Sequence, residues 1–554
     1  MLIGALCAAL LSVVISHQTV YVTEGNQVLS HKPHGDFIAF VEFNDSLGST
    51  GWTSLTIITN GSYPDADQAH AAGVGEGYAT AERILQSWVN TMSTYCKEAT
   101  EFCNKLDEFV YENQYWMNYK IDKMAGVSNY WYHVRVLSRQ IQGLYDGFNM
   151  VYPGRLQLRD FYLMNLSGDL EDLEQALGGG LKEVRARKRD KVERAHMLGT
   201  GSCSALVKWL PHELLTSHIT WNSYQSMIRI AKNYIFNFRK GPEDMSSRIP
   251  GKRQVFTSYP GYVSSGDDYS LLSSGLLSME TTIGNSNASL WEFVKPKGSV
   301  PEFMRSVIAN RLASSGKEWA DTFKQYNSGT YNNQWMIIDY NKFDPTAKSL
   351  SDGTLWVLEQ IPGYVTSADQ TDVLRQQKYW SSYNTPFYPD IFKMSGCQVS
   401  VDKYGPMFAY DTTPRALIFK RDQHKVVDME TLYDLMRYND YKNDPLSKCD
   451  CEPPYTAENS IAARSDLNPA NGTYLLPFLG HRLHGATDYK GTNAEMMKSL
   501  SFRAAAGPTA EQQPPFRWST SDWSDVPHVG MNDLQHFSEI TVSFEEDSAA
   551  VVDF

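Results

Sequence analysis

The first part of the chain alternates apolar and polar residues in the manner of β-strands. Three segments are rich in strand-forming residues, and two of them carry Gly-Asn or Asn-Gly turn signals: 19–28, 36–45 and 52–61. A period of two places one face of each segment against a core. These segments predict a sheet at the start of the fold.

A short glycine-rich segment follows these strands. Gly73, Gly75 and Gly77 in "GVGEGYA" lack the spacing of the dinucleotide-binding fingerprint and its strand–helix–strand context. We predict that this segment is a loop.

From Ala79 the apolar positions recur with the period of an α-helix, as in Ile84, Leu85, Trp88, Val89 and Met92. Helices are predicted one after another to about residue 176. Cys96 and Cys103 lie seven residues apart in this region. Two turns of one helix would separate them by about 10 Å, too far for a disulfide. If they are bonded, the helix must break near residues 97–100.

Strand patterns return after Cys203. They fall at 204–210, 217–224, 253–261, 269–284, 334–343 and 353–365. The chain beyond Asp372 is richer in Pro, Tyr and Asn and is expected to be mostly loops. The order of strands, helices, strands, then helices and loops predicts an α+β fold of two sheets with helical cover.

Composition narrows the class of protein. The net charge of −13 and the pI of about 5.5 leave no general basic surface, so we expect no nucleic-acid partner. The basic residues do concentrate at 181–196, where seven Lys or Arg accompany three acids. Such a segment buries little surface and tolerates cutting. We expect an exposed linker over about 178–202.

The chain begins with an apolar run. Residues 1–16 are expected to be a signal peptide cleaved near Ser16, and an uncleaved anchor is the alternative. No later run of 18 apolar residues follows, so no transmembrane segment is expected in the mature chain. The sequence also contains five glycosylation sequons: Asn44, Asn60, Asn165, Asn287 and Asn471. Together these features predict a lysosomal or secreted protein.

Six cysteines follow the predicted signal peptide. In an oxidising compartment the close pairs Cys96/Cys103 and Cys449/Cys451 can form disulfides. Cys203 and Cys397 are then left as thiols.

Two familiar catalytic patterns are missing. No G-x-S-x-G motif is present, which leaves the nucleophile elbow of α/β-hydrolases unsupported. In "HELLTSH" the second histidine, His218, lies six residues after His212, whereas a zincin helix requires four. We therefore expect no metal and no cofactor.

Cys203 has an unusual setting in "GTGSCSALVKWLP". Gly199, Gly201 and Ser202 allow a strained backbone before it, and a buried strand is predicted after it. If the bond between Ser202 and Cys203 is cut, Cys203 acquires a free α-amine beside its thiol. An α-amine titrates near pH 8 in peptides, so it can act as the base for its own side chain. The charged linker would then cover a nucleophile until cleavage.

Long blocks of the sequence resemble the phospholipase B-like family of lysosomal and secreted proteins. They are "GSCSALVKWLP", "SHITWNSYQSMIRIAKNY", "SSGDDYSLLSSGLLSMETTIGN", "YNTPFYPDIF" and "DTTPRALIFKRD". The resemblance covers essentially the whole mature chain. It implies an N-terminal nucleophile hydrolase fold, a four-layer αββα sandwich. It also implies autocatalytic cleavage into chains 17–202 and 203–554 that form one domain.

The resemblance also implies the site residues. Cys203 matches the nucleophile, and the other matched positions are His218, Trp221, Thr282, Asn384 and Arg415, with Thr281 a close rival to Thr282. The C-D-C spacing of Cys449 and Cys451 is tighter than in relatives.

Each of these residues also has an ordinary structural interpretation. Taken alone, Cys203, His218 and Trp221 would be core residues, Asn384 a turn residue, Arg415 an ion-paired side chain and Thr282 a strand residue. Catalytic roles fit together better. Asn384 can donate to an oxyanion, Arg415 can bind a carboxylate or phosphate, and Trp221 can wall an acyl group. Arg415 or a protonated His218 near the sulfur would lower the thiol pKa.

These residues predict a cysteine hydrolase that removes fatty acyl groups from phospholipids or related lipids. The alternatives are an amidase acting on N-acyl amides and a catalytically silent glycoprotein that binds lipid or a partner. The expected partner is an acyl-bearing small molecule, and a homo-oligomer is left open.

Overall fold

The structure is a computed structural model that describes residues 17–96, 99–178, 203–243 and 246–545. The predicted signal peptide, Ser202 and nearly all of the predicted linker lie outside the described residues.

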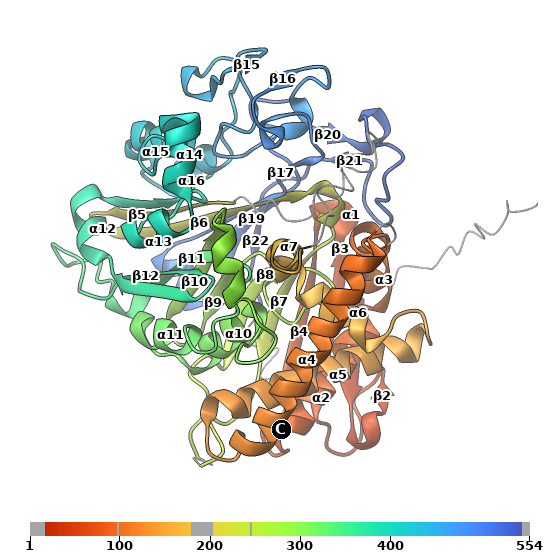
Figure 1. Ribbon diagram of the computed structural model, residues 1–554. Coiled ribbons are helices and arrows are strands. Elements are labelled where there is room, and N and C mark those ends of the chain that lie inside the picture. Colours follow the sequence, from red (N-terminus) through yellow and green to blue (C-terminus); the bar gives the residue numbers. More distant parts are fainter. Residues whose placement is uncertain (1–16, 97–98, 179–202, 244–245, 546–554) are drawn as a thin grey trace, which may run out of the picture.

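Two β-sheets form the centre of the molecule (Figure 1). The larger has eleven strands in the order β13-β12-β11-β10-β9-β8-β7-β4-β3-β1-β2. Their bounds are β1 His17–Val22, β2 Val28–Leu29, β3 Ala39–Ser46, β4 Trp52–Thr59, β7 Arg229–Ile235, β8 Arg253–Ser258, β9 Tyr269–Leu272, β10 Leu276–Thr282, β11 Asn333–Asp339, β12 Leu355–Ile361 and β13 Tyr364–Asp369. Neighbouring strands are antiparallel, except that β4 and β7 are parallel. This pair joins the part of the chain before Cys203 to the part after it in one sheet.

The smaller sheet has seven strands in the order β14-β5-β6-β18-β19-β22, and β17 also pairs with β6. Their bounds are β5 Cys203–Leu210, β6 Glu213–Ser223, β14 Tyr379–Ser382, β17 His484–Ala486, β18 Asp488–Thr492, β19 Phe502–Ala506 and β22 Ile540–Val542. All of these strands follow Cys203 in sequence.

The two sheets pack face to face through an apolar core. Alternate residues of β5 (Ala205, Val207 and Trp209) meet Leu277 and Met279 of β10 within one buried cluster. The period of two in each strand produces this arrangement, because every second side chain faces the opposite sheet.

Helices cover both outer faces. Those that cover or border the larger sheet are α2 Asp65–Ala79, α3 Ala81–Thr91, α4 Thr100–Met124, α5 Asn129–Val151, α6 Leu158–Asn165, α7 Ser167–Ala176, α10 Glu302–Leu312 and α11 Gly316–Phe323. On the smaller sheet lie α15 Pro414–Asp422 and α16 Met429–Met436. The remaining helices are α12 Thr371–Gln377, which contacts strands of both sheets, α13 Pro389–Met394, which packs against β12 and α14 Cys397–Tyr404, and α17 Ala494–Lys498, which contacts β6. The layers therefore run αββα, and the predicted fold class is confirmed (Figure 1).

The prediction of a loop at Gly73, Gly75 and Gly77 is wrong, because all three lie in α2. A Cβ on Gly73 would lie 2.1 Å from the carbonyl oxygen of Gln140 in α5, and one on Gly143 would lie 2.0 Å from that of His70 in α2. The glycines let the two helix backbones touch. The requirement for close approach outweighs the low helix propensity of glycine.

Both predicted disulfides are present, and Cys203 and Cys397 are free. Cys96 lies after α3, and Cys103 lies in the first turn of α4, with 5.8 Å between their Cα atoms. The break that the spacing required therefore exists. Among the described residues, no helix combines the length and the apolar character needed to cross a membrane.

Candidate active site

Cys203 is the first residue of β5 and lies in the wall of a cavity of about 760 Å³. Its side chain is buried, and both polar groups of its backbone are bound by predicted site residues. The backbone nitrogen donates to Oδ1 of Asn384 (3.0 Å), and the carbonyl oxygen accepts from Nη1 of Arg415 (2.6 Å). The structure thus brings Cys203, Asn384 and Arg415 together from three elements far apart in sequence.

Asn384 has a left-handed backbone, with φ of 66°. Its Nδ2 donates to the carbonyl oxygen of Thr282 (2.7 Å), and its backbone nitrogen donates to Oγ1 of Thr281 (3.4 Å). Both rival threonines therefore contact Asn384, Thr281 through its side chain and Thr282 through its backbone. In this state the Asn384 side chain fixes the Cys203 nitrogen; its predicted role as an oxyanion donor stays a prediction.

A buried chain of hydrogen bonds supports the Asn384 loop, and the sequence analysis did not find it. Oγ of Ser382 lies 2.7 Å from Oγ1 of Thr281 and donates to Oε1 of Gln334 (2.6 Å). Gln334 donates to Glu359 (2.6 Å), which also accepts from the backbone nitrogen of Phe387 (2.6 Å). Both ends of the loop are tied to β10 and β12. In the sequence, Ser382, Gln334 and Glu359 are single polar residues within strands, and nothing in their spacing indicates that they contact one another.

Arg415 and Trp221 form one wall of the cavity. The guanidinium lies 4.3 Å from the centre of the Trp221 ring, a cation–π contact. Burial lowers the pKa of Arg415 to about 10, so it remains charged at neutral and acidic pH. The charge holds the Cys203 carbonyl, and the indole supplies an apolar surface beside it.

His218 lies between the two sheets and is not among the residues that line the cavity. Its Nε2 donates to the carbonyl oxygen of Glu280 (2.8 Å). Burial, together with the charge of Lys490, lowers the pKa of His218 well below its ordinary value. The expectation that a protonated His218 favours the thiolate is therefore not supported, because this imidazole stays neutral.

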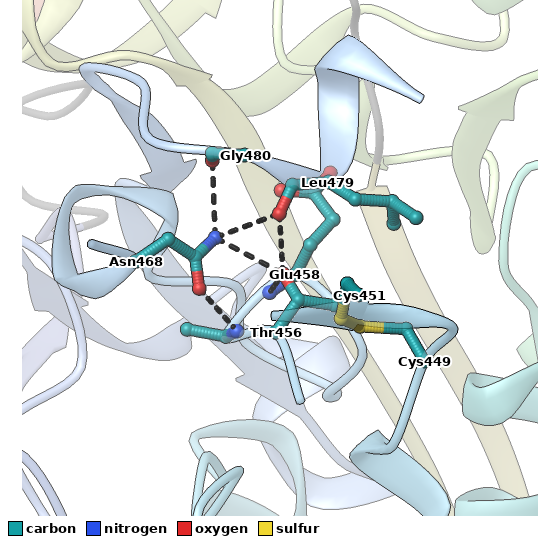
Figure 2. Close-up of a disulfide and its surroundings, with 8 residues drawn as sticks. Cys449, Cys451, Thr456, Glu458, Asn468, Leu479 and Gly480 are labelled. Carbon is teal, nitrogen blue, oxygen red and sulfur yellow. Dashed lines mark hydrogen bonds between the residues drawn. A yellow bond between two sulfur atoms is a disulfide. The ribbon is translucent and has the colours of Figure 1, made fainter. Parts of the chain in front are cut away.

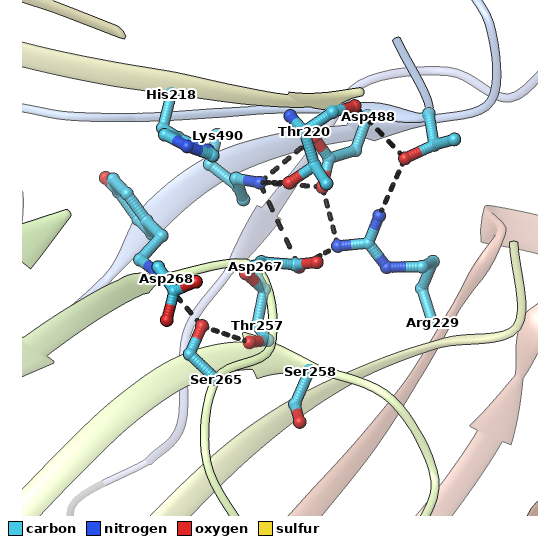
Figure 3. Close-up of polar contacts among 12 residues, drawn as sticks. His218, Thr220, Arg229, Thr257, Ser258, Ser265, Asp267, Asp268, Asp488 and Lys490 are labelled. Carbon is cyan, nitrogen blue, oxygen red and sulfur yellow. Dashed lines mark hydrogen bonds and ion pairs between the residues drawn. The ribbon is translucent and has the colours of Figure 1, made fainter. Parts of the chain in front are cut away.

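A polar cluster lies behind Cys203 between the sheets (Figure 3). Thr220 is the register partner of Cys203 and accepts a hydrogen bond from Nζ of Lys490 (2.6 Å). Lys490 and Arg229 both pair with Asp488, at 2.8 and 2.6 Å, and Arg229 also pairs with Asp267. Although burial opposes it, the two cations hold the pKa of Asp488 at about 2. Two cations and two carboxylates thus neutralise one another inside the fold.

The thiol of Cys203 is protonated in the uncut chain. Burial raises its pKa well above the ordinary value, and the nearby carboxyl of Glu280 raises it further. A neutral thiol in a closed site needs a base or a change of environment before it can attack a carbonyl.

Hydrogen bonds tie together the loops that follow the second disulfide (Figure 2). Nδ2 of Asn468 donates to Thr456, Leu479 and Gly480, each at 3.0 Å. These bonds tie the segment that follows Cys449–Cys451 to the segment that carries Arg482, and Glu458 pairs with Arg482 at 3.0 Å. Glu458, Leu479 and Arg482 all line the cavity.

The sequons differ in accessibility. Asn165 is 3% exposed, and its Nδ2 donates to the carbonyl oxygens of Phe161 (2.8 Å) and Gly261 (3.0 Å). Asn60 is also buried, and its Nδ2 donates to the Phe37 carbonyl (3.2 Å). Burial of both amides argues against glycans there. Asn471 is exposed, and Asn44 and Asn287 are partly exposed.

The fold and site define a class: an αββα protein with a buried cysteine as the first residue of a sheet strand, in the wall of a large cavity. The chain belongs to the phospholipase B family, whose model, described as Phospholipase B, matches residues 39–542. This membership supports a hydrolase.

Curated relatives cover nearly the whole chain. The human protein named "Putative phospholipase B-like 2" is 45% identical over 95% of this chain and 89% of its own length. The rat protein of the same name is 45% identical over 94% of this chain and 89% of its own length. "Phospholipase B-like protein B" of Dictyostelium discoideum is 39% identical over 90% of this chain and 84% of its own length.

A solved structure of penicillin V acylase from Agrobacterium tumefaciens was also found. It aligns with 61% of this chain and 98% of its own, at 8% identity and a TM-score of 0.28. A similarity this low carries no argument about this protein.

Proposed function

We propose that the protein is an acyl hydrolase in which the thiol of Cys203 is the nucleophile. Cleavage between Ser202 and Cys203 gives this residue the α-amine that serves as its base. The observation that carries the proposal is a pair of hydrogen bonds to the backbone of Cys203 in the cavity wall. Asn384 accepts from its nitrogen, and Arg415 donates to its carbonyl oxygen. The nitrogen fixed in this way is the atom that becomes the amine.

We propose that the chain cuts itself by the same chemistry. The sulfur attacks the carbonyl carbon of Ser202, the C–N bond breaks, and a thioester forms while the thiol proton passes to the released amine. Water then opens the thioester, which leaves a carboxylate on Ser202 and a free thiol on Cys203. Proteases that trim the charged linker are compatible with this reaction.

Turnover repeats the chemistry on a substrate. The α-amine takes the thiol proton as sulfur attacks the acyl carbonyl, the leaving group receives that proton, and water releases the acid from the thioester. Trp221, Tyr383 and Phe408 line the cavity and suit an acyl chain. With the names of the relatives, this supports fatty acyl groups of phospholipids or related lipids as the substrate. The lysosomal or secreted location is proposed from the apolar leader and the sequons of the sequence alone.

The proposal is tested by making the protein without other proteases and sequencing the chain ends. Wild type and Cys397→Ala are expected to give two chains, the second beginning at Cys203, whereas Cys203→Ala stays uncut. Cys397 is the matched control because it is the other free cysteine and lines the same cavity. Cleavage of the Cys203→Ala chain at residue 203 would show that another protease acts.

Substrate class is decided on the processed protein. A diacyl phospholipid, a lysophospholipid and an N-acyl amide of equal chain length are compared, with Cys203→Ser as the inactive reference. If the amide is hydrolysed faster than both esters, the protein is an amidase and the proposal of a lipase is wrong. If nothing turns over and a thiol-directed acylating probe fails to label Cys203, the protein is a binding glycoprotein.

A further inference from the structure

Thr220 of β6 lies directly opposite Cys203 of β5 in the smaller sheet. Residues opposite each other in an antiparallel pair point to the same face of the sheet, with about 5 Å between their Cβ atoms. That face is the one packed against the larger sheet, because Ala205, two residues after Cys203, lies in the core between the sheets. Cys203 and Thr220 also both line the cavity. The cross-strand neighbour of the thiol is thus a buried hydroxyl group.

Four hydrogen bonds hold Thr220 in place, several of them within the cluster of Figure 3. Its backbone nitrogen donates to Oδ1 of Asp488 (2.8 Å). Its carbonyl oxygen accepts from the backbone nitrogen of Thr487 (2.8 Å) and from Oγ1 of the same residue (3.2 Å). Its own Oγ1 accepts from Nζ of Lys490 (2.6 Å). The backbone and the side chain of Thr220 are therefore both fixed opposite Cys203.

The hydroxyl of Thr220 has a proton left to donate. An ammonium group only donates, so the hydroxyl oxygen is the acceptor in its bond with Lys490. Among the described residues, this hydroxyl donates to no oxygen or nitrogen atom. The sulfur of Cys203 is the acceptor at the opposite position on the same face, and the backbone nitrogen of Trp221 donates to that sulfur as well. A thiolate at this position would have two donors.

Lys490 strengthens this donor. Its side chain is fully buried, and its ammonium group contacts both the Thr220 hydroxyl and the carboxylate of Asp488. Asp488 also pairs with Arg229, so it is shared between two cations. A hydroxyl that accepts a hydrogen bond from a cation donates its own hydrogen more strongly, because each bond in a chain polarises the next. The positive charge of Lys490 therefore acts toward the sulfur through Thr220.

The other groups around the thiol act in both directions. Burial raises the pKa of Cys203 most, and Glu280 of β10 raises it further. The Trp221 nitrogen and then Lys490 of β18 lower this pKa, whereas Asp268, just before β9, raises it. Three more ionisable groups interact electrostatically with the thiol: Arg415, Tyr259 and Tyr331. A donor on the sulfur opposes the burial and the carboxyls that disfavour the thiolate.

We infer that Thr220 and Lys490 together stabilise the thiolate of Cys203: the ammonium donates to the hydroxyl, and the hydroxyl donates to the sulfur. Thr220 is then a catalytic residue, since its hydroxyl contacts the reacting sulfur. Lys490 is a positioning residue that acts through Thr220. No proton moves along this pair, and the proton of the thiol still passes to the amine. The pair makes charged sulfur less unfavourable in a buried site.

The inference deepens the proposed function, and it rests on that function only in treating Cys203 as the nucleophile. Reactivity of the thiol is measured without a substrate, and it is measured whether or not the chain has been cut. The two proposals therefore fail separately: absence of turnover or of cleavage contradicts the proposed function, whereas the thiol measurements below test the role of Thr220.

The experiment measures the rate at which iodoacetamide alkylates Cys203 across pH, in a Cys397→Ala background that removes the other free thiol. Mass spectrometry of the peptides gives a separate curve for cut and uncut molecules, because cleavage makes Cys203 a chain end. Samples taken early in synthesis supply the uncut form of variants that cut themselves. Below the thiol pKa the rate follows the fraction of thiolate, so a rise of one pH unit in the pKa slows alkylation tenfold.

Thr220→Val should alkylate about tenfold more slowly than the parent in the same form of the chain, as loss of one hydrogen bond to a charged group predicts. Thr220→Ser keeps the hydroxyl and should restore the parent profile. Thr216→Val is the matched control, because Thr216 lies on the same face of β6 and its hydroxyl contacts that of Tyr340 (2.9 Å) instead. It should leave the profile of Cys203 unchanged.

A parent-like profile for Thr220→Val, no recovery in Thr220→Ser, or an equal shift in Thr216→Val would overturn the inference. Unfolding temperatures show whether each variant folds. If Thr220→Val does not fold, Thr220→Ala decides the question, because it removes the hydroxyl without placing a methyl group against Lys490.

A double-mutant cycle tests whether Lys490 acts through Thr220. Lys490→Gln removes the charge and should slow alkylation of the parent, and it should have a smaller effect when Thr220 is already valine. Equal effects in the two backgrounds would show that the lysine acts on the sulfur directly, which would contradict the chain from ammonium to hydroxyl to sulfur.

Discussion

At the scale of single residues, the contacts of Cys203 indicate that its thiol reacts differently before and after cleavage. In the uncut chain its nitrogen is an amide held by Asn384, and its thiol is buried near Glu280. His218 is a poor base, because burial lowers its pKa well below the ordinary value and its Nε2 is bonded to a backbone carbonyl. Cleavage replaces the amide by an amine at a position already fixed, so the residue supplies its own base.

This difference predicts a change in thiol reactivity. Alkylation of Cys203 in the uncut chain should be slow and should rise only well above the ordinary thiol pKa, because burial and Glu280 disfavour the thiolate. After cleavage a neighbouring ammonium favours the thiolate, so the rise should move to lower pH. Mass spectrometry of alkylated peptides across pH measures both forms.

Both free thiols border the cavity, so the measurement is repeated in Cys397→Ala, where any alkylation of a free thiol belongs to Cys203. Identical pH profiles for the cut and uncut chains would show that the new terminus does not activate the thiol.

At the scale of elements, many strands before Asp372 were predictable, whereas the helix contacts were not. The prediction of mostly loops beyond Asp372 missed five strands of the smaller sheet, and no strand was predicted at β7: the missed strands are β7, β14, β17, β18, β19 and β22. The blocks around β5, β6, β10 and β11 alternate clearly, and the structure forms strands there. The glycines of α2 were misread because their purpose is a contact with α5, about 70 residues away in sequence. Local patterns report which side of a segment is buried, and they do not report how closely another backbone approaches.

The same reasoning separates the site residues that were predicted from those that were missed. Cys203, Asn384 and Arg415 lie in blocks that resemble a family, and the structure brings them together. Glu280 and Glu302 gave no signal, because an isolated acid in a strand or at the start of a helix is ordinary in sequence. Both are buried outside any ion pair of the described residues, a setting that only the fold creates.

The α2–α5 contact predicts a large effect from a small substitution. Gly143→Ala would place a Cβ 2.0 Å from the carbonyl oxygen of His70, so the helices must separate and the protein should lose about 2 kcal/mol or more. Thermal unfolding followed by circular dichroism measures the loss. Gly126→Ala is the matched control, since its Cβ meets nothing within 4 Å. Equal midpoints for the two variants would show that the contact tolerates a methyl group.

At the scale of the whole molecule, the αββα fold places an acidic cavity between its layers. Ten carboxyls of the described residues have raised pKa values, chiefly through burial. Among them are Asp169 at about 6, Asp172 and Glu359 at about 7, and Asp268, Glu280 and Glu302, which are raised without a fixed value. Two buried histidines act in the opposite sense, with His133 lowered to about 3 and His218 well below its ordinary value. Their balance sets how stability depends on pH.

A raised carboxyl pKa means that the folded state binds a proton that the unfolded chain releases. The resulting stability is fully present below about pH 4, the unfolded value, and is lost as pH rises through the folded values of about 6 to 7. A histidine with a lowered pKa loses stability as pH falls below about 6.5, because only the unfolded chain then binds the proton. The raised carboxyls outnumber the two histidines, so we expect them to set the direction of the stability change between pH 5 and 7.5.

We therefore expect the protein to unfold at a higher temperature at pH 5 than at pH 7.5, in calorimetry at constant ionic strength. Glu359→Gln should reduce this difference, because it removes one of the raised carboxyls, while the exposed Glu292→Gln should leave it unchanged. Below about pH 4 the unfolding temperature should fall as the pH falls. Asp488 and Glu511, whose pKa values are lowered to about 2 in the folded protein, are then protonated first in the unfolded chain. A midpoint that falls steadily from pH 7.5 to 5 would mean that the histidines dominate and that the buried carboxyls are ionised.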